Sequence, residues 1–259
     1  PIYYLGLMKL AQMEGLKTIA WGQGIGPLHY KFTRWITKKT LAKCTAISVR
    51  DRKSAKLLSE WDIHHSIAPD PVWALRSKDI SDFIQTSQPI VAINLRNHPS
   101  LTIKKLKTLT NALVDFQKIT NTYILLVPFQ ASQDFTIAHH ISKKLSKSHE
   151  IIQIDDPQRM KGLFKNTNMT IGMRLHCLIM AASERSRCFA LSYDPKVKYL
   201  MEEINIPGWE LDQLPDDSDM IKDAWLKCYF TSAKPLNSSI QSLKERAMLH
   251  KKLLEQVAS

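Results

Sequence analysis

The sequence predicts an α/β protein built from two doubly wound domains with parallel sheets. Short apolar runs alternate with amphipathic helical segments along most of the 259 residues, which is typical of parallel sheets covered by helices. A polar stretch at 77–88, rich in Ser and Asp, interrupts this alternation before it starts again. The composition, 44% hydrophobic and 23% charged, is that of an ordinary folded protein.

The first domain is expected to occupy residues 1–76. Apolar periodicity predicts its elements in this order: helix 3–14, strand 18–21, helix 32–43, strand 46–49, helix 52–61 and an extended segment at 65–68. Because helix 3–14 opens the sequence with no initiator Met and no strand before it, we expect this domain to lack the first strands of a complete sheet.

The second domain is expected at 88–215, where the alternation is more regular. Its predicted elements are strand 90–95, helix 102–118, strand 123–127, helix 133–145, strand 151–154, helix 158–165, strand 169–171, helix 174–183, strand 188–191 and helix 195–204. Residues 216–259 add helices at 221–233 and 236–257, which we expect to pack back on the domains. Ligands of parallel sheets bind at the carboxyl ends of the strands, so we expect the domains to face each other across a binding cleft.

The net charge of +12, from 36 Lys and Arg against 24 Asp and Glu, indicates an anionic partner. Phosphorylated substrates, nucleic acid and an anionic membrane surface all fit, and charge alone does not choose among them. The lysine clusters at 104–107, 143–147 and 251–252 are typical of solvated helix faces. No run interleaves aromatic and basic residues as a groove for single-stranded nucleic acid would, so we expect no nucleic-acid partner.

The cysteines and histidines favour a reduced, intracellular protein without a bound metal. The four cysteines form no CxxC pair and no zinc spacing, and the histidine pairs at 64–65 and 139–140 each point in two directions. No apolar run reaches the ~18 residues that span a bilayer. We therefore expect a cytoplasmic protein that makes at most peripheral contact with the inner face of a membrane.

The segment 169–176 is the most informative part of the chain. A short apolar strand reaches Gly172 and is followed by Arg174 and His176 at the start of a helix. A guanidinium and an imidazole beside the N–H groups of a helix N-terminus suit an anion that also needs a proton. The alternative is a surface arginine and a histidine of the capping region. The apolar face of the helix comes from other residues: Leu175, Leu178, Ile179 and Ala182.

A glycine-rich turn at 22–27 follows the first predicted strand. Gly24 and Gly26 would let the backbone approach a phosphate or carboxylate and present its N–H groups. Pro27 does not fit the dinucleotide-binding pattern. A plain tight turn is the alternative.

Two arginines follow predicted strands in the same way. Arg50 comes after strand 46–49, and Arg96 comes after strand 90–95. An arginine at the end of a parallel strand can bind a carboxylate or phosphate with two hydrogen bonds. The alternative for Arg50 is an ion pair with a neighbouring acid such as Asp51.

The connection at 192–196 joins a strand to a helix. We expect Asp194 to cap this helix, with Pro195 in its first turn. Tyr193 or Lys196 could contact a substrate instead.

Together these motifs resemble the polysaccharide pyruvyl transferases, most of all the type that acts on bacterial cell-wall glycopolymers. The resemblance covers residues 5–209 and rests on GQGIGP at 22–27, ISVRD at 47–51, PDP at 69–71, GMRLH at 172–176 and SYDPK at 192–196. It implies a GT-B-like fold and phosphoenolpyruvate as a co-substrate, with no cofactor. It also implies a sugar acceptor in a polysaccharide or its lipid-linked precursor, and a pyruvate ketal as the product.

The resemblance further implies roles for the candidate residues. The donor carries a carboxylate and a phosphate, so several arginines are needed and no metal is expected. His176 fits as the general acid, because a histidine titrates near pH ~6.5 and can be charged close to neutrality. The implied substrate-binding residues are Arg174, Arg50, Arg96, Gly24, Gly26 and Lys196.

Two rival functions remain open at this point. A GT-B glycosyltransferase that uses a nucleotide sugar would share the fold and a basic diphosphate site. A nucleic-acid-binding or regulatory module would use the net charge and bind generic strands in a salt-sensitive way. Neither rival should respond to phosphoenolpyruvate.

Overall fold

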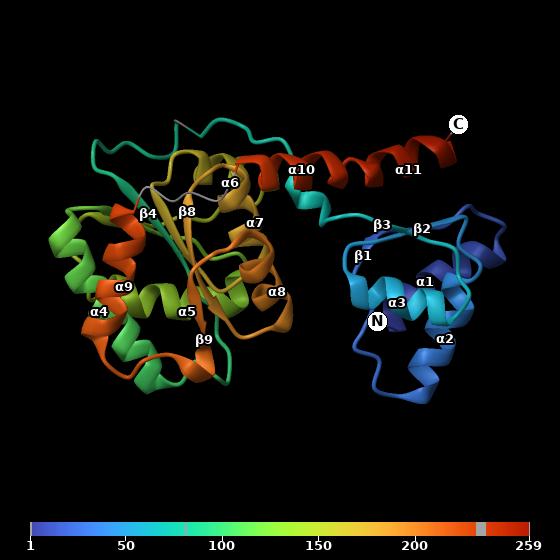
Figure 1. Ribbon diagram of the computed structural model, residues 1–259, viewed down its shortest axis with the longest axis horizontal. Coiled ribbons are helices and arrows are strands. Elements are labelled where there is room, and N and C mark those ends of the chain that lie inside the picture. Colours follow the sequence, from blue (N-terminus) through green and yellow to red (C-terminus); the bar gives the residue numbers. More distant parts are fainter. Residues whose placement is uncertain (1, 81, 232–236, 259) are drawn as a thin grey trace. The chain divides into compact units, whose positions relative to one another are not determined.

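The computed structural model describes residues 2–80, 82–231 and 237–258. The chain divides into two compact units, which are described separately (Figure 1). Unit 1 contains Pro1–Ala74 together with Gln241–Ser259, and unit 2 contains Leu75–Ile240. Both units are parallel α/β structures.

Unit 1 contains a three-stranded parallel sheet. Its elements are α1 (Ile2–Met13), β1 (Ile19–Gln23), α2 (Lys31–Leu41), β2 (Ala46–Val49), α3 (Arg52–Glu60), β3 (Ser66–Ile67), a 3₁₀ turn (Pro71–Ala74) and α11 (Leu249–Ala258). The strand order β1-β2-β3 follows the chain, so right-handed crossovers place α2 and α3 on one face of the sheet. The core on this face contains Ala20, Leu41, Ile47, Val49, Leu58 and Trp61.

The other face of this sheet is covered by α11, which contacts β2. His250 of α11 is buried, with Nδ1 2.8 Å from Ser48 Oγ and Nε2 2.9 Å from the carbonyl oxygen of Pro69. Because a carbonyl oxygen only accepts, Nε2 carries the proton, and in the neutral ring Nδ1 accepts from the Ser48 hydroxyl. Ser48 Oγ also accepts from the N–H of Gly22 at 2.9 Å. The C-terminal helix is thus tied to β1, β2 and the loop at Pro69.

Unit 2 contains a six-stranded parallel sheet. Its elements are β4 (Ile90–Asn94), α4 (Ile103–Thr120), β5 (Tyr123–Leu126), α5 (Ala131–Ser142), β6 (His149–Ile151), α6 (Pro157–Lys165), β7 (Met169–Gly172), α7 (Leu175–Ser183), β8 (Arg187–Ser192), α8 (Pro195–Ile204), β9 (Gly208–Glu210), a 3₁₀ turn (Leu211–Gln213) and α9 (Ser218–Phe230). The sequence of α10 (Asn237–Ala247) crosses the boundary between the units.

The strand order of unit 2 is β6-β5-β4-β7-β8-β9, so the sheet grows first to one side of β4 and then to the other. The position between β4 and β7 is the topological switch point, where the loops that leave adjacent strands diverge and make room for a ligand. Asn94 at the end of β4 is in register with Gly172 at the end of β7. The segments that carry Arg96 and Arg174 therefore start side by side.

Most predicted elements are present within a few residues, and β2 and α8 have the predicted bounds. The predicted strand 151–154 is misplaced, because β6 pairs with β5 only through His149–Ile151. Ile152 and Ile154 are buried beyond the end of the strand, which explains their apolar character. The three-residue strand β9 is not predicted, since so short a segment carries too little periodicity.

The predicted helix 236–257 is in fact two helices. The N–H of Met248 donates to the carbonyl oxygen of Glu245 at 3.2 Å, a tight turn that ends α10 before α11 begins at Leu249. The predicted helix end at 233 and start at 236 lie outside the described residues. No helix in the described part of the chain is both long and apolar enough to cross a bilayer.

Candidate functional site

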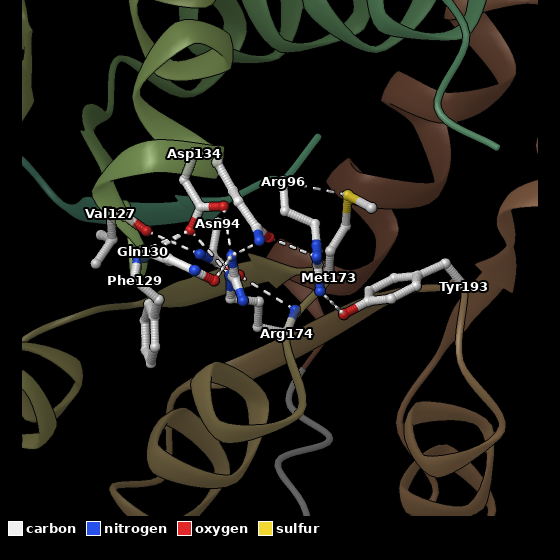
Figure 2. A network of polar contacts seen from close by, with 10 residues as sticks. Asn94, Arg96, Val127, Phe129, Gln130, Asp134, Met173, Arg174 and Tyr193 are labelled. Atoms are coloured by element: carbon white, nitrogen blue, oxygen red, sulfur yellow. Dashed lines mark hydrogen bonds and ion pairs between the residues drawn. The ribbon is translucent and has the colours of Figure 1, made fainter. Parts of the chain in front are cut away.

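The carboxyl edge of the unit 2 sheet carries a connected set of polar side chains (Figure 2). Asn94, the buried last residue of β4, donates from Nδ2 to the carbonyl oxygen of Val127 at 2.8 Å. Its Oδ1 accepts from the N–H of Arg174 at 3.1 Å, and its carbonyl oxygen accepts from the N–H of Met173 at 2.9 Å. One residue thus fixes the loops after β5 and β7 to the end of β4.

Asp134, in the first turn of α5, is the buried carboxylate of this edge. Its side chain has no solvent exposure and accepts from the N–H groups of Phe129 and Gln130, each at 2.9 Å. Arg174 approaches the same carboxylate twice, with Nε 2.9 Å from Oδ2 and Nη2 2.6 Å from Oδ1. A buried carboxylate is stable only with an opposite charge and hydrogen-bond donors around it, and here Arg174 and the two backbone N–H groups provide both.

Arg174 is therefore held in place, with its charge balanced. Its Nη2 also lies 3.5 Å from Gln130 Oε1 and 3.4 Å from Gln133 Oε1. Within the described residues Nη1 has no hydrogen-bond partner. The sequence suggests that Arg174 is available to a substrate, but the structure leaves only one edge of its guanidinium for that purpose.

Arg96 follows the end of β4 and contacts the same Gln133 side chain as Arg174. Its Nη2 donates to Gln133 Oε1, and its Nη1 donates to Tyr193 Oη at 2.8 Å. The Nε of Arg96 is buried and has no hydrogen-bond partner. Among the residues that the structure describes, Arg96 forms no ion pair. Its guanidinium donates to two neutral oxygens and lies 5.1 Å from the centre of the Tyr193 ring. A partly buried cation of this kind is stabilised by a bound anion.

The helix α7 begins at this edge, with Arg174 as its N-cap residue. The side chain of Arg174 makes no capping hydrogen bond to this helix, and the N-terminus of a helix attracts anions. His176 lies in the first turn and is half-buried. Burial raises the pKa of the neighbouring Cys177 thiol well above its ordinary value, so this thiol is protonated and is not a nucleophile at neutral pH.

Arg50 lies in unit 1 and forms an ion pair with Asp70, with 2.7 Å between Nη1 and Oδ2. Arg50 is thus paired with an acid, but this acid is Asp70, a neighbour in the fold, and not Asp51, its neighbour in the sequence. Asp51 caps α3 instead, by accepting from the N–H of Ser54 at 2.8 Å. The ion pair joins the ISVRD and PDP motifs within unit 1.

The glycine-rich turn at 22–27 is held by a hydroxyl group, since the N–H of Ile25 donates to Ser54 Oγ at 2.7 Å. Gly26 has a φ of 97°, a conformation that favours glycine. Gly24 is half-buried and Gly26 is exposed. A substrate-binding role for these two glycines stays a prediction.

The connection at 192–196 has the predicted helix cap. The N–H of Lys196 donates to Asp194 Oδ1 at 2.8 Å, and Pro195 is in the first turn of α8. The ring of Tyr193 lies against the ring of His98, with 4.6 Å between centres. Tyr193 therefore belongs to the group around Arg96, whereas substrate binding by Lys196 stays a prediction.

Sequence reasoning misses the residues that organise this edge: Asn94, Gln130, Gln133 and Asp134. Asn94 gives one usable signal, because it is a polar residue inside the otherwise apolar strand 90–95. Asp134 gives no comparable signal, since its partner Arg174 is distant in the sequence and becomes a neighbour only in the fold. Among the described residues, no group of three or more His, Cys, Asp or Glu side chains is placed to hold a metal ion.

The fold and the site define a parallel α/β protein with two arginines at the switch point of its larger sheet. Residues 1–195 match the family described as polysaccharide pyruvyl transferase. The chain therefore belongs to this family of transferases, and the predicted family is confirmed. A comparison with curated proteins gave no match.

Several solved structures share the fold. The UDP-GlcNAc 2-epimerase of Methanocaldococcus jannaschii has a TM-score of 0.68 over 97% of this chain and 74% of its own, at 11% identity. The Neisseria meningitidis epimerase, bound to UDP-GlcNAc, has a TM-score of 0.64 over 97% and 73%, at 11% identity. Sucrose-phosphate synthase from Thermosynechococcus elongatus has a TM-score of 0.56 over 97% and 71%, at 15% identity. These likenesses show the fold, which is GT-B-like as predicted.

The buried ion pair makes a prediction about stability. Asp134→Asn and Arg174→Gln should each lower the free energy of unfolding by about 3 kcal/mol, because each leaves the other charge buried and uncompensated. The double variant should lose clearly less than the sum of the two. Urea denaturation measures these values, with the exposed Lys143→Gln as a control that should change stability by less than about 0.5 kcal/mol. Additive losses would contradict the coupling.

Proposed function

We propose that this family member transfers pyruvate from phosphoenolpyruvate to a sugar of a cell-surface polysaccharide or of its lipid-linked precursor. The observation that carries the proposal is Arg96, a partly buried guanidinium bonded to the neutral oxygens of Tyr193 and Gln133. A donor that carries both a carboxylate and a phosphate would supply the missing counter-charge. Membership of the family supports the sugar acceptor.

Different residues near Arg96 would bind and position the donor. One anionic group of the donor would bind Arg96 and the N-terminus of α7, where the partial positive charge of the helix favours an anion. Arg174, whose charge is balanced by Asp134, would hold the start of α7 in position and offer Nη1. Donors fixed in advance stabilise developing charge without reorganisation during the reaction.

The proposed reaction forms a cyclic ketal and releases phosphate. A proton adds to C3 of the enol phosphate, and a sugar hydroxyl adds to C2 with loss of its own proton. The bond between C2 and the phosphate oxygen then breaks, and phosphate leaves with the electron pair. The second hydroxyl adds to C2 with loss of its proton, which closes the ring.

We assign the proton donor for C3 to His176. It lies two residues after Arg174, in the first turn of the helix whose N-terminus would bind the donor. At this position the imidazole would lie close to the bound donor, as proton transfer to C3 requires.

The remaining predicted residues are proposed as further substrate contacts. These are Arg50, Gly24 and Gly26 of unit 1, and Lys196 of unit 2. For Arg50 the ion pair with Asp70 also supports a role in holding the PDP motif. We propose that the reaction takes place in the cytoplasm, at the inner face of the membrane where a lipid-linked acceptor would be presented.

A glycosyltransferase that uses a nucleotide sugar is the second candidate. It is favoured by one observation, the likeness of the fold to an epimerase structure bound to UDP-GlcNAc. The two candidates differ in the donor that should stabilise the protein.

Phosphoenolpyruvate should raise the Tm of the wild-type protein, because a ligand that binds only the folded state stabilises it. Arg96→Gln should lose most of this shift, since it removes the charge and keeps a polar side chain. Lys143→Gln removes an exposed charge from the same unit and should keep the shift. A thermal-shift assay gives all three results. Stabilisation by UDP-sugars and not by phosphoenolpyruvate would contradict the proposal and favour the glycosyltransferase.

His176→Gln should bind the donor but turn it over slowly. We expect the Tm shift with phosphoenolpyruvate to persist, while phosphate release falls by about 10²–10⁴-fold, the usual contribution of a general acid. Phosphate release would be followed with a panel of hexopyranosides as acceptors. An unchanged rate would exclude His176 as the acid, and a lost Tm shift would assign it to donor binding.

A further inference from the structure

The helix α2 of unit 1 presents an exposed aromatic and basic face. Its buried side consists of Thr37, Thr40 and Leu41. At the helical spacing of about 100° per residue, Trp35 lies opposite these residues and is 54% exposed. We call this face the α2 surface; its exposed residues are Lys31, Phe32, Arg34, Trp35, Lys38 and Lys39.

The α2 surface lies in a stretch of sequence without acidic residues. Between residues 15 and 50 there is no Asp or Glu, whereas seven residues are basic: Lys17, Lys31, Arg34, Lys38, Lys39, Lys43 and Arg50. Arg34 pairs with Glu60 of α3 at 3.3 Å, but the three lysines of the α2 surface form no ion pair with any described residue. The surface therefore keeps a positive charge that complements an anionic partner.

This helix corrects one expectation from the sequence, because it does interleave aromatic and basic residues. Nucleic acid would use such residues by stacking bases on the ring faces. Here Phe32 stacks with Trp35, with 6.1 Å between ring centres, and Lys39 Nζ lies 5.6 Å from the Trp35 ring centre. With these neighbours against its ring, Trp35 is poorly placed to stack on bases.

A bilayer interface uses the same residues differently. Aromatic rings insert at the level of the lipid headgroups. The aliphatic chains of the lysines lie along these rings, and their ammonium groups reach the lipid phosphates. We propose that the α2 surface docks unit 1 onto an anionic lipid bilayer. This inference goes beyond the proposed reaction, and it would bring the enzyme to a lipid-linked acceptor.

Cosedimentation of the full chain with lipid vesicles tests the proposal. Vesicles of phosphatidylcholine mixed with phosphatidylglycerol should bind the protein at least about tenfold better than phosphatidylcholine alone. The double variant Lys38→Gln/Lys39→Gln should lose about tenfold in binding to the anionic vesicles. Lys143→Gln/Lys144→Gln removes the same charge from an exposed lysine pair of unit 2 and should bind like the wild type.

The aromatic part of the surface is tested in the same assay. Trp35→Ser should weaken vesicle binding severalfold, whereas Phe230→Ser, which changes an exposed aromatic residue of α9, should not. Far-UV circular dichroism verifies that each variant is folded.

Three outcomes would overturn the proposal. The first is equal vesicle binding by the wild type and both α2 variants. The second is binding of single-stranded DNA that depends on Lys38 and Lys39, without vesicle binding. The third is a dimer that depends on Trp35, again without vesicle binding. The vesicle assay needs no phosphoenolpyruvate, so a failure of the proposed reaction would appear only in the thermal-shift and phosphate-release assays.

Discussion

The buried carboxylate of Asp134 is the group on which the candidate site depends. A charge without solvent exposure is stable only when donors surround it, and here they come from the loop before α5 and from Arg174 after β7. These contacts hold the start of α5 next to the start of α7. The same arrangement brings Gln133 of α5 within hydrogen-bond distance of Arg96. The contacts of Asp134 therefore also help to set the position of Arg96.

The carboxyl edge of the unit 2 sheet carries two arginines, of which one forms an ion pair with a carboxylate and the other, among the described residues, does not. Arg174 forms an ion pair with Asp134, whereas Arg96 forms none with the described residues and donates to the neutral oxygens of Tyr193 and Gln133. Arg50 of unit 1 resembles Arg174, because its ion pair with Asp70 joins two family motifs. The motifs of this polysaccharide pyruvyl transferase family member therefore include residues that build the site as well as candidates for contact with substrate.

Sequence reasoning predicts features whose signal lies within one segment. The bounds of β2 and α8 are correct, and Arg96 and Arg174 are correctly placed after strands that end at one edge. The balanced charge of Arg174 is not predictable in this way, because Asp134 is 40 residues away and has no distinguishing pattern around it. The break at Met248 is missed for a related reason, since helical periodicity continues across it into α11.

A crystal structure of the protein with phosphoenolpyruvate bound tests the central claim most directly. A carboxylate or phosphate oxygen of the ligand should lie within hydrogen-bond distance of the Arg96 guanidinium and of an N–H group in the first turn of α7. Phosphoenolpyruvate bound at another part of the chain would contradict this assignment. The same holds if the diphosphate of a nucleotide sugar occupies these donors and phosphoenolpyruvate does not bind.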